Sequence, residues 1–416
     1  MRLAVARAAG VVDQGALAGA SFLSTVLMGR ALEPSAFGVF ALAFAVLVLA
    51  ERVQHGLIGA PLLAVPTDPH TRGERGGGGL LVWTLQWRLL ALAAVAVAIS
   101  GAVLSMVVDW PETTPAALAI IPTLLGTQAR DLSRYLCYQH QKSRWAALIG
   151  GLSGTIQLVT LGALFWVGHL NISTGILALG FSGAAAFLIT LPLVCSLYRS
   201  TDANGSPRQA LWARGRWLAA SNVVFWGATQ LFLFVAAALL GPAQAGVFRA
   251  AQSVLGPTHF VVAGLFNSSA PVVATQLAAG RGTWASVRPA VAVIGGAVAG
   301  YCSLVALFPD AILTLLFGSQ YSGYGQVVQI LAIGYLMTGL AGGMTLVLVV
   351  LHRTDLVLRG HVATLLVGLI AAYPLIKWLG LFGAALGLSL VYTVRFVALA
   401  FYAGAAGRAA TEVLDA

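Results

Sequence analysis

Polar residues recur at helical spacing within an apolar stretch just past the middle of the chain. Arg249, Gln252, Gly256, His259 and Asn267 follow one another at intervals of 3, 4, 3 and 8 residues. Arg249 and Asn267 are 18 residues apart, which is five turns of an α-helix, so one continuous helix would place them on a single face. Because a guanidinium binds phosphate oxygens through paired hydrogen bonds, this stripe predicts a site for an anionic substrate.

Four more polar or basic residues within apolar stretches are candidates for the same water-accessible cavity: Asn222, Arg30, Arg88 and Arg130. Two other roles stay open for such residues. A buried amide or hydroxyl can join two helices by hydrogen bonding, and the side chains of Arg88 and Arg134 can extend to lipid headgroups at the cytoplasmic surface. Arg130 and Arg134 share one helical face, and Asp131 is placed to pair with Arg134 at i, i+3.

Asp13 is an acidic residue near the start of the first apolar stretch. A carboxylate inside a bilayer is costly, so it needs a partner, water or a function. It can take up a proton or hold a cation, which makes Asp13 the candidate for ion coupling. Capping the N-terminus of the first helix is an equally good alternative.

Signatures of catalysis and of metal binding are missing from the sequence. The glycine-rich segment 73–79 lacks the Gly-Lys-Ser/Thr sequence of a phosphate-binding loop. The seven histidines show no metal-ligand spacing, and no nucleophile elbow or CxxC pair occurs. We therefore predict a protein that is not an enzyme, with no catalytic residue, no metal and no cofactor. A membrane polymerase or glycosyltransferase is an alternative, but such enzymes usually have a large external loop or a carboxylate cluster.

The composition excludes a water-soluble domain. Of the 416 residues 59% are apolar and 9% are charged, and the mean hydropathy is +0.89. Soluble domains carry about a quarter charged residues. Segments of about ten residues with alternating polarity, which mark an outer-membrane barrel, do not occur. We therefore predict an all-α integral membrane protein.

Apolar stretches and the polar breaks between them predict about twelve transmembrane helices. The predicted spans are 11–29, 36–58, 80–107, 115–138, 145–167, 175–198, 217–240, 245–270, 289–308, 325–351, 359–377 and 381–403. No break exceeds about 20 residues, so there is no room for a soluble catalytic domain on either face of the membrane.

The loops alternate between basic and nearly uncharged, which predicts the topology. One set of loops, with both termini and the adjoining span ends, carries 17 Lys and Arg residues, and the other set carries three. The positive-inside rule places the basic set and both termini in the cytoplasm. The first ten residues are then a short cytoplasmic lead. The net charge of +10 is explained by orientation and by attraction to anionic lipid, so we predict membrane lipid and no nucleic acid as a partner.

The chain repeats itself at half its length. Residues 32–47 and 240–255 match at 8 of 16 positions, share the sequence Pro-x3-Gly-Val-Phe, and are 208 residues apart. Parallel six-helix repeats are a transporter architecture with the substrate site at the repeat interface. We therefore predict two pseudo-symmetric six-helix lobes, 1–206 and 207–416, and a cavity lined chiefly by the first, seventh and eighth spans.

These repeat copies resemble the signature of Wzx-type polysaccharide flippases. The resemblance rests on GRALEPSAFGVFALAFAVLVLAE (29–51), RDLSRYLCYQHQKSRWAAL (130–148) and LGPAQAGVFRAAQSVLGP (240–257). That family belongs to the MOP superfamily, together with the lipid II flippase MurJ and the MATE drug antiporters. The resemblance covers nearly the whole chain and implies two six-helix lobes. By position, Arg249 matches a recurrent family arginine and Arg30 matches the first-loop arginine.

The resemblance implies a function and a location. The protein would move an undecaprenyl-diphosphate-linked oligosaccharide from the cytoplasmic to the periplasmic leaflet of the inner membrane by alternating access, for polysaccharide biosynthesis and export. A proton or sodium ion is the implied coupling ion, and a polysaccharide polymerase and export machinery are the implied protein partners. The alternative is a MATE-like multidrug or cation antiporter, which needs a carboxylate at its cation site, for which Asp13 is the candidate.

Overall fold

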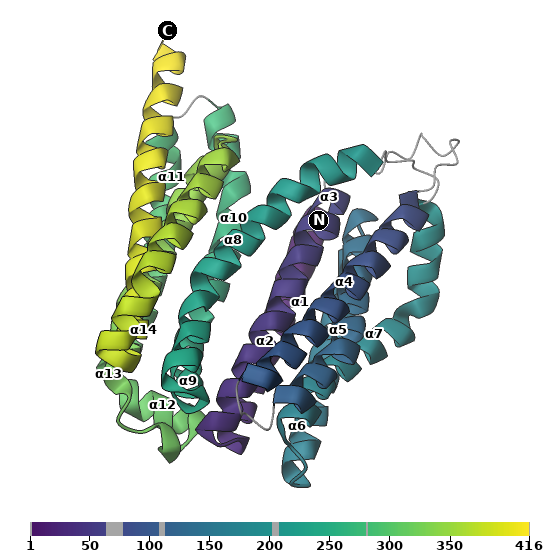
Figure 1. Ribbon diagram of the computed structural model, residues 1–416. Coiled ribbons are helices and arrows are strands. Elements are labelled where there is room, and N and C mark those ends of the chain that lie inside the picture. Colours follow the sequence, from purple (N-terminus) through teal and green to yellow (C-terminus); the bar gives the residue numbers. More distant parts are fainter. Residues whose placement is uncertain (1, 64–77, 108–112, 202–207, 280–281, 416) are drawn as a thin grey trace. The chain divides into compact units, whose positions relative to one another are not determined.

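The computed structural model describes residues 2–63, 78–107, 113–201, 208–279 and 282–415. All regular secondary structure in this part of the chain is helical (Figure 1). The chain divides into two compact units: unit 1 comprises Met1–Leu32 and Val39–Val223, and unit 2 comprises Glu33–Gly38 and Val224–Ala416. The predicted lobe boundary, between residues 206 and 207, lies outside the described residues.

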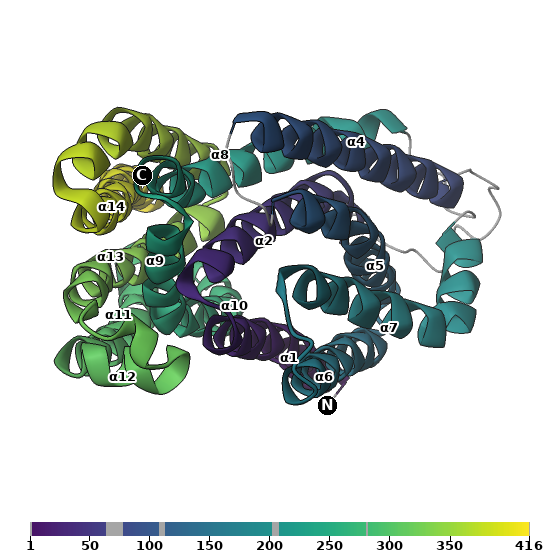
Figure 2. The ribbon, with the colours of Figure 1, turned by 60° about the horizontal axis from the view of Figure 1, so that its bottom comes forward.

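Unit 1 is built from two closely packed helix pairs, α1 with α6 and α5 with α7, and Figure 2 shows the members of each pair side by side. Its elements are α1 (Arg2–Ala31), most of α2 (Pro34–Gln54), the π-helix η1 (His55–Gly59), α3 (Ala60–Leu63), α4 (Gly78–Val107), α5 (Thr113–Gln139), α6 (Ser143–Trp166), α7 (Ile172–Thr201) and the first part of α8 (Arg208–Leu240).

Small residues set the distance between α1 and α6. A methyl group added at Gly154 would lie 3.1 Å from the Cβ of Ala20 and 3.3 Å from the main-chain oxygen of Ala16. One turn earlier, Gly150 faces the carboxylate of Asp13, where a side chain would have no room. Glycines spaced four residues apart allow two membrane helices to approach closely. The α1–α6 contact therefore depends on residues that leave space for a buried acid.

In unit 2, α13 packs along α14 and against α11 (Figure 1). The elements of this unit are the rest of α8, α9 (Pro242–Leu255), α10 (Pro257–Ala278), α11 (Thr283–Leu307), α12 (Pro309–Phe317), the short 3-10 helix η2 (Ser319–Tyr321), α13 (Gly325–Val350) and α14 (Thr354–Asp415).

The helices account for each of the twelve predicted spans. Nine stretches of the described residues are long and apolar enough to cross a membrane. Two further helices, α1 and α5, contain 30 and 27 residues and carry buried charged side chains. The last predicted pair corresponds to α14, which is interrupted by a non-helical residue, Gly380, with φ 57° and ψ −134°. The chain is a multi-pass membrane protein.

Two features of the fold differ from the sequence-based expectation. The segment 308–324, read from the sequence as an external loop, contains the nine-residue helix α12, which begins with Pro309 at its first turn and ends before Gly318. The lead at residues 2–10 is helical because α1 begins at Arg2. In both places the hydropathy pattern located the polar break and could not report helical turns inside it.

The first turns of the two repeat copies pack against each other within unit 2. A methyl group added at Gly38 would collide with the main chain of Pro242, and one added at Gly246 would collide with the main chain of Pro34. Proline begins each helix, and the glycine follows four residues later. The same Pro-x3-Gly pattern therefore serves as both halves of one reciprocal helix crossing, which explains why glycine stands at that place in both copies.

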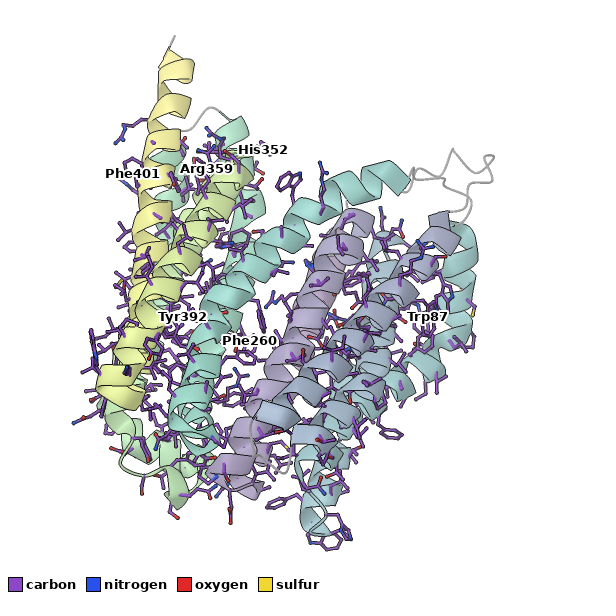
Figure 3. All side chains as sticks on the ribbon, in the orientation of Figure 1. Trp87, Phe260, His352, Arg359, Tyr392 and Phe401 are labelled. Carbon is purple, nitrogen blue, oxygen red and sulfur yellow. The ribbon has the colours of Figure 1, made fainter. Side chains whose placement is uncertain are left out.

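Large apolar side chains project from the helices of both units. Trp87 on α4 and Phe401 on α14, labelled in Figure 3, are 46% and 69% exposed. In water such exposure would be unfavourable, but hydrocarbon chains of lipid solvate it. Exposed apolar surface on long helices agrees with the membrane location that the composition indicates.

Candidate functional site

Unit 1 contains a buried network of charged side chains centred on α5. Asp131 accepts hydrogen bonds from Arg130 Nε (3.0 Å) and Nη2 (3.1 Å) and from Arg134 Nη1 (3.0 Å). The i, i+3 pairing of Asp131 with Arg134 that the sequence predicted is confirmed. Buried ions are stable only when they are paired and hydrogen-bonded. Asp131 supplies such pairing to two arginines of its own helix at once.

Arg134 also binds Asp13 on α1. Its Nε atom lies 3.1 Å from both carboxylate oxygens, its Nη2 atom lies 2.5 Å from Oδ2, and the hydroxyl of Tyr138 donates to the same oxygen at 2.5 Å. Asp13 is completely buried. Two sequence-based alternatives are wrong. Asp13 lies well inside α1 and does not cap its N-terminus, and Arg134 is buried in ion pairs and does not extend to lipid headgroups.

Glu51, in the last turn of α2, completes the network. Its Oε1 atom lies 3.5 Å from Arg130 Nη2, and its side chain is 35% exposed. One turn later the buried amide of Gln54 donates to Gln86 Oε1 on α4 (2.9 Å) and to the main-chain oxygen of Gln128 on α5 (2.8 Å). Gln86 donates in turn to Gln128 Oε1 at 2.7 Å. Ionic and amide hydrogen bonds therefore join α1, α2, α4 and α5.

The other predicted residues of unit 1 lie apart from this network. Asn222 on α8 donates to the main-chain oxygen of Arg52 (3.1 Å) and so joins two helices. Arg30 and Arg88 are exposed, at the end of α1 and on α4 respectively. Of the predicted candidates in unit 1, the structure brings only Arg130 and Asp13 into one network.

In unit 2 the predicted polar stripe is divided between two helices. The α-helical hydrogen-bond pattern is interrupted at Gly256 and Pro257, where proline has no N–H to donate, and the amide of Gly256 bonds three residues back to Ser253. Arg249 and Gln252 belong to α9 and His259 belongs to α10. Gly256 itself keeps helical dihedral angles (φ −50°, ψ −40°), so the interruption between Arg249 and Asn267 is one of hydrogen bonding. The side chain of Asn267 lies outside the described residues.

Arg249 lies among tyrosines from α13 and α14. It is half-buried and close enough to interact electrostatically with the phenol groups of Tyr335 and Tyr392. These two rings meet edge to face at 5.5 Å and their hydroxyls share a hydrogen bond. The imidazole of His259 lies 5.3 Å from the ring of Tyr335. Two predicted residues, Arg249 and His259, therefore come together around a tyrosine pair that sequence reasoning missed.

A second arginine extends this cluster along α14. Arg395 interacts electrostatically with Tyr392, and its guanidinium carbon lies 4.7 Å from the centre of the Phe225 ring on α8. That ring lies 4.9 Å from the imidazole of His361. The Nε atom of Arg395 is buried and has no hydrogen-bond partner among the described residues. A guanidinium that stacks on an aromatic ring and has an N–H group still available to donate is well suited to bind an anion.

We call these seven residues the cationic cluster: Arg249, His259, Tyr335, Tyr392, Arg395, Phe225 and His361. No Asp or Glu occurs between residues 203 and 309 or between 325 and 350, so α8, α9, α10, α11 and α13 contribute no carboxylate. Within the described ranges, no group of three or more His, Cys, Asp and Glu side chains is arranged to hold a metal ion. The cluster offers cations, phenol hydroxyls and imidazoles, which suit an anionic, hydroxyl-rich ligand.

No family model matches the chain, and no curated protein matches it. Solved structures are similar over nearly the full length. An inward-facing multidrug resistance MATE family transporter of the MOP superfamily aligns with TM-score 0.69 and 13% identity, over 99% of this chain and 98% of that one. The eukaryotic MATE transporter AtDTX14 aligns with TM-score 0.64 and 16% identity, over 99% and 98%.

A MOP superfamily transporter from Pyrococcus furiosus, described as having a binding pocket of reverse polarity that suggests a different function, aligns with TM-score 0.69 and 13% identity, over 99% of this chain and 96% of that one. The chain has the MATE fold. This confirms the predicted class, an all-α membrane protein of about twelve helices in two lobes. At these sequence identities the similarity shows the fold alone, and the transported substrate has to be inferred from the side chains.

Proposed function

We propose that the protein is a flippase for an undecaprenyl-diphosphate-linked oligosaccharide, moving it across the inner membrane from the cytoplasmic to the periplasmic leaflet by alternating access. The observation that carries the proposal is the cationic cluster, whose members on α8, α9, α10 and α13 come from helices without an acidic residue. Two guanidiniums without competing carboxylates match a diphosphate, which presents several anionic oxygens at close spacing.

The physical need for such a protein follows from the cargo. A glycan headgroup cannot cross about 30 Å of hydrocarbon unaided, because each unsatisfied polar group in that region costs several kcal/mol. Arginines can hold the diphosphate, and the hydroxyls of Tyr335 and Tyr392 with the imidazole of His259 can exchange hydrogen bonds with sugar hydroxyls. The reaction requires no covalent chemistry, only binding and a change in access.

A role for each predicted residue follows from its place. Arg249 and His259 would contact the cargo. Gln252, on α9 with Arg249, has a buried Oε1 atom without a partner among the described residues. Arg30, exposed at the end of α1, would meet the anionic headgroup at the outer surface. We further propose that a proton or sodium gradient drives transport, and that a polysaccharide polymerase and export machinery receive the product.

A MATE-like drug or cation antiporter is the second candidate, because several solved structures with this fold are MATE family transporters. That function needs a carboxylate able to meet a cation. Asp13, the candidate that the sequence offered, already binds Arg134 and Tyr138, and the cationic cluster would repel a cation. The solved structure from Pyrococcus furiosus, described as having a binding pocket of reverse polarity, is consistent with pockets of different polarity in this fold.

Binding by the purified protein separates the two candidates. We expect undecaprenyl diphosphate in detergent micelles to bind, and the lipophilic cation tetraphenylphosphonium not to bind. Arg249→Ala should weaken undecaprenyl diphosphate binding about 10–100-fold, since a hydrogen bond to a charged group contributes about 1.5–3 kcal/mol. Lys377→Ala is the matched control, because Lys377 is an exposed cation at Tyr373, outside the cluster. Selective binding of tetraphenylphosphonium would favour the antiporter.

A further inference from the structure

The charged network of unit 1 contains one carboxylate more than it contains guanidiniums. Asp13, Asp131 and Glu51 are the acids, and Arg130 and Arg134 are the bases that contact them. Fully ionised, these five side chains carry one net negative charge within a membrane protein, and the further cation that acts on Glu51, Arg52, is exposed. An uncompensated charge of this kind is costly, so the network is suited to bind one positive charge.

Two of the three acids are already held firmly. Asp13 receives hydrogen bonds from two nitrogens of Arg134 and from Tyr138, and Asp131 receives hydrogen bonds from both arginines. Every one of these contacts is 3.1 Å or shorter. Protonation of either acid would break several charge-assisted hydrogen bonds at once, so these two carboxylates serve to organise the network.

Glu51 differs from both in contact and in access. A single contact of 3.5 Å joins it to Arg130, whose Nε and Nη2 atoms are already engaged by Asp131 at about 3 Å. With 35% of its side chain exposed, Glu51 is also the acid of the three that a proton can reach, since the side chains of Asp13 and Asp131 are 0% and 7% exposed. Of the three acids, Glu51 therefore loses the weakest contact on protonation and is the most accessible to a proton.

The local backbone supports a functional role at this position. Directly after α2 comes the π-helix η1 (His55–Gly59), a form that is rare and frequent at functional sites. Gln54, three residues after Glu51, is 1% exposed, and its Oε1 atom has no hydrogen-bond partner in the described chain. An unused acceptor buried one turn from a carboxylate can stabilise a proton donor such as a hydronium ion or a carboxylic acid.

We propose that Glu51 is the proton-binding residue of unit 1, and that Asp13 is not. One proton from water is added to one Glu51 oxygen, the carboxylate becomes a carboxylic acid, and the network becomes neutral. The charged groups that act on Glu51 are Arg130, Asp131 and Arg134 from α5, with Arg52 from its own helix, which is exposed. Protonation removes the ionic attraction between α2 and α5 and leaves the α1–α5 attraction intact.

Infrared difference spectroscopy of the purified full-length protein tests this without any cargo, so its outcome is independent of the flippase proposal. Spectra are taken as the pH rises from about 5 to about 9, where freely exposed Asp and Glu are already ionised. We expect a carboxylic-acid C=O band that is lost as the pH rises, is absent in Glu51→Gln, and is shifted in position but retained in Glu51→Asp.

Glu33→Gln is the matched control, because Glu33 is an exposed acid just before the first residue of α2, at the other end from Glu51. Its spectra should match those of the wild type. A band that persists unchanged in Glu51→Gln would overturn the proposal. If Glu51→Gln fails to fold, the Glu51→Asp spectra decide, since an unshifted band there would assign the proton to another group.

Discussion

Asp13 and Arg134 form a buried ion pair across 121 positions of sequence, with two carboxylate oxygens facing two guanidinium nitrogens at 2.5–3.1 Å. The pair joins α1 to α5 in unit 1. Asp131 holds the other side of the same guanidinium, so Arg134 lies between two carboxylates. This arrangement makes the acid of the first helix a structural partner and leaves proton binding to another residue.

Removing one partner of this pair should destabilise the protein. Asp13→Asn replaces one of the two carboxylates that bind Arg134 with a neutral amide. Breaking a buried ion pair in this way costs about 3–5 kcal/mol. We expect a clear loss of thermal stability in detergent. The double variant Asp13→Asn/Arg134→Met should recover part of that loss, because Asp131 keeps Arg130 as its partner. Additive losses in the double variant would contradict the pairing.

A methyl group added on α6 beside the Asp13 carboxylate should also destabilise the protein. Gly150 faces that carboxylate without room for a side chain, whereas a methyl group added at the neighbouring Gly151 meets nothing within 4 Å. Overpacking of this kind costs about 1–3 kcal/mol. We therefore expect Gly150→Ala to lower the melting temperature and Gly151→Ala to leave it unchanged. Equal melting temperatures would show that Asp13 does not lie against α6.

Arg395 should contribute to anion binding as Arg249 does. The Nε atom of Arg395 has no hydrogen-bond partner in the described chain. Arg395→Gln removes this positively charged donor and should weaken undecaprenyl diphosphate binding about tenfold or more. Arg359→Gln is the control, because Arg359 is an exposed arginine on the same helix α14 (Figure 3). Isothermal titration calorimetry in detergent measures both. Equal losses in the two variants would indicate general electrostatics and no site at Arg395.

His140, in the turn after α5, predicts a pH dependence of stability. Burial, and then the charge of Lys142, lower the pKa of His140 below its ordinary value of 6.5. The unfolded chain therefore binds this proton more readily than the folded chain does, and folding stability falls as the pH drops through 6.5. Thermal melts at pH 5 and pH 7.5 should differ less in His140→Gln than in the wild type. An unchanged difference would exclude His140 as a source of acid sensitivity.

The helices could be predicted from sequence because their signal is local. Runs of about 20 apolar residues located every span, and the Pro-x3-Gly-Val-Phe repeat identified equivalent helix starts at Pro34 and Pro242. The short helix α12 and the break at Gly256–Pro257 were missed, because hydropathy averages over windows longer than either feature.

The sites were predicted only in part because their contacts are not local. The spacing of Asp131 and Arg134 revealed their i, i+3 pair, but nothing in the sequence links Asp13 to a residue on α5. Tyr335 and Tyr392 resemble ordinary membrane aromatics until the fold brings them to Arg249. Glu51 lies at the polar end of an apolar span, and nothing in the sequence links it to its contact on α5, Arg130.

Cells that lack this protein give the most direct test of the flippase proposal. Lipid-linked glycan and surface polysaccharide are measured together in the deletion strain and after complementation with wild type or Arg249→Ala. The proposal predicts that undecaprenyl-diphosphate-linked glycan accumulates on the cytoplasmic side and surface polymer is missing, and that only the wild type restores both, with equal amounts of the two proteins in the membrane. Unchanged polysaccharide with altered sensitivity to cationic drugs would contradict it.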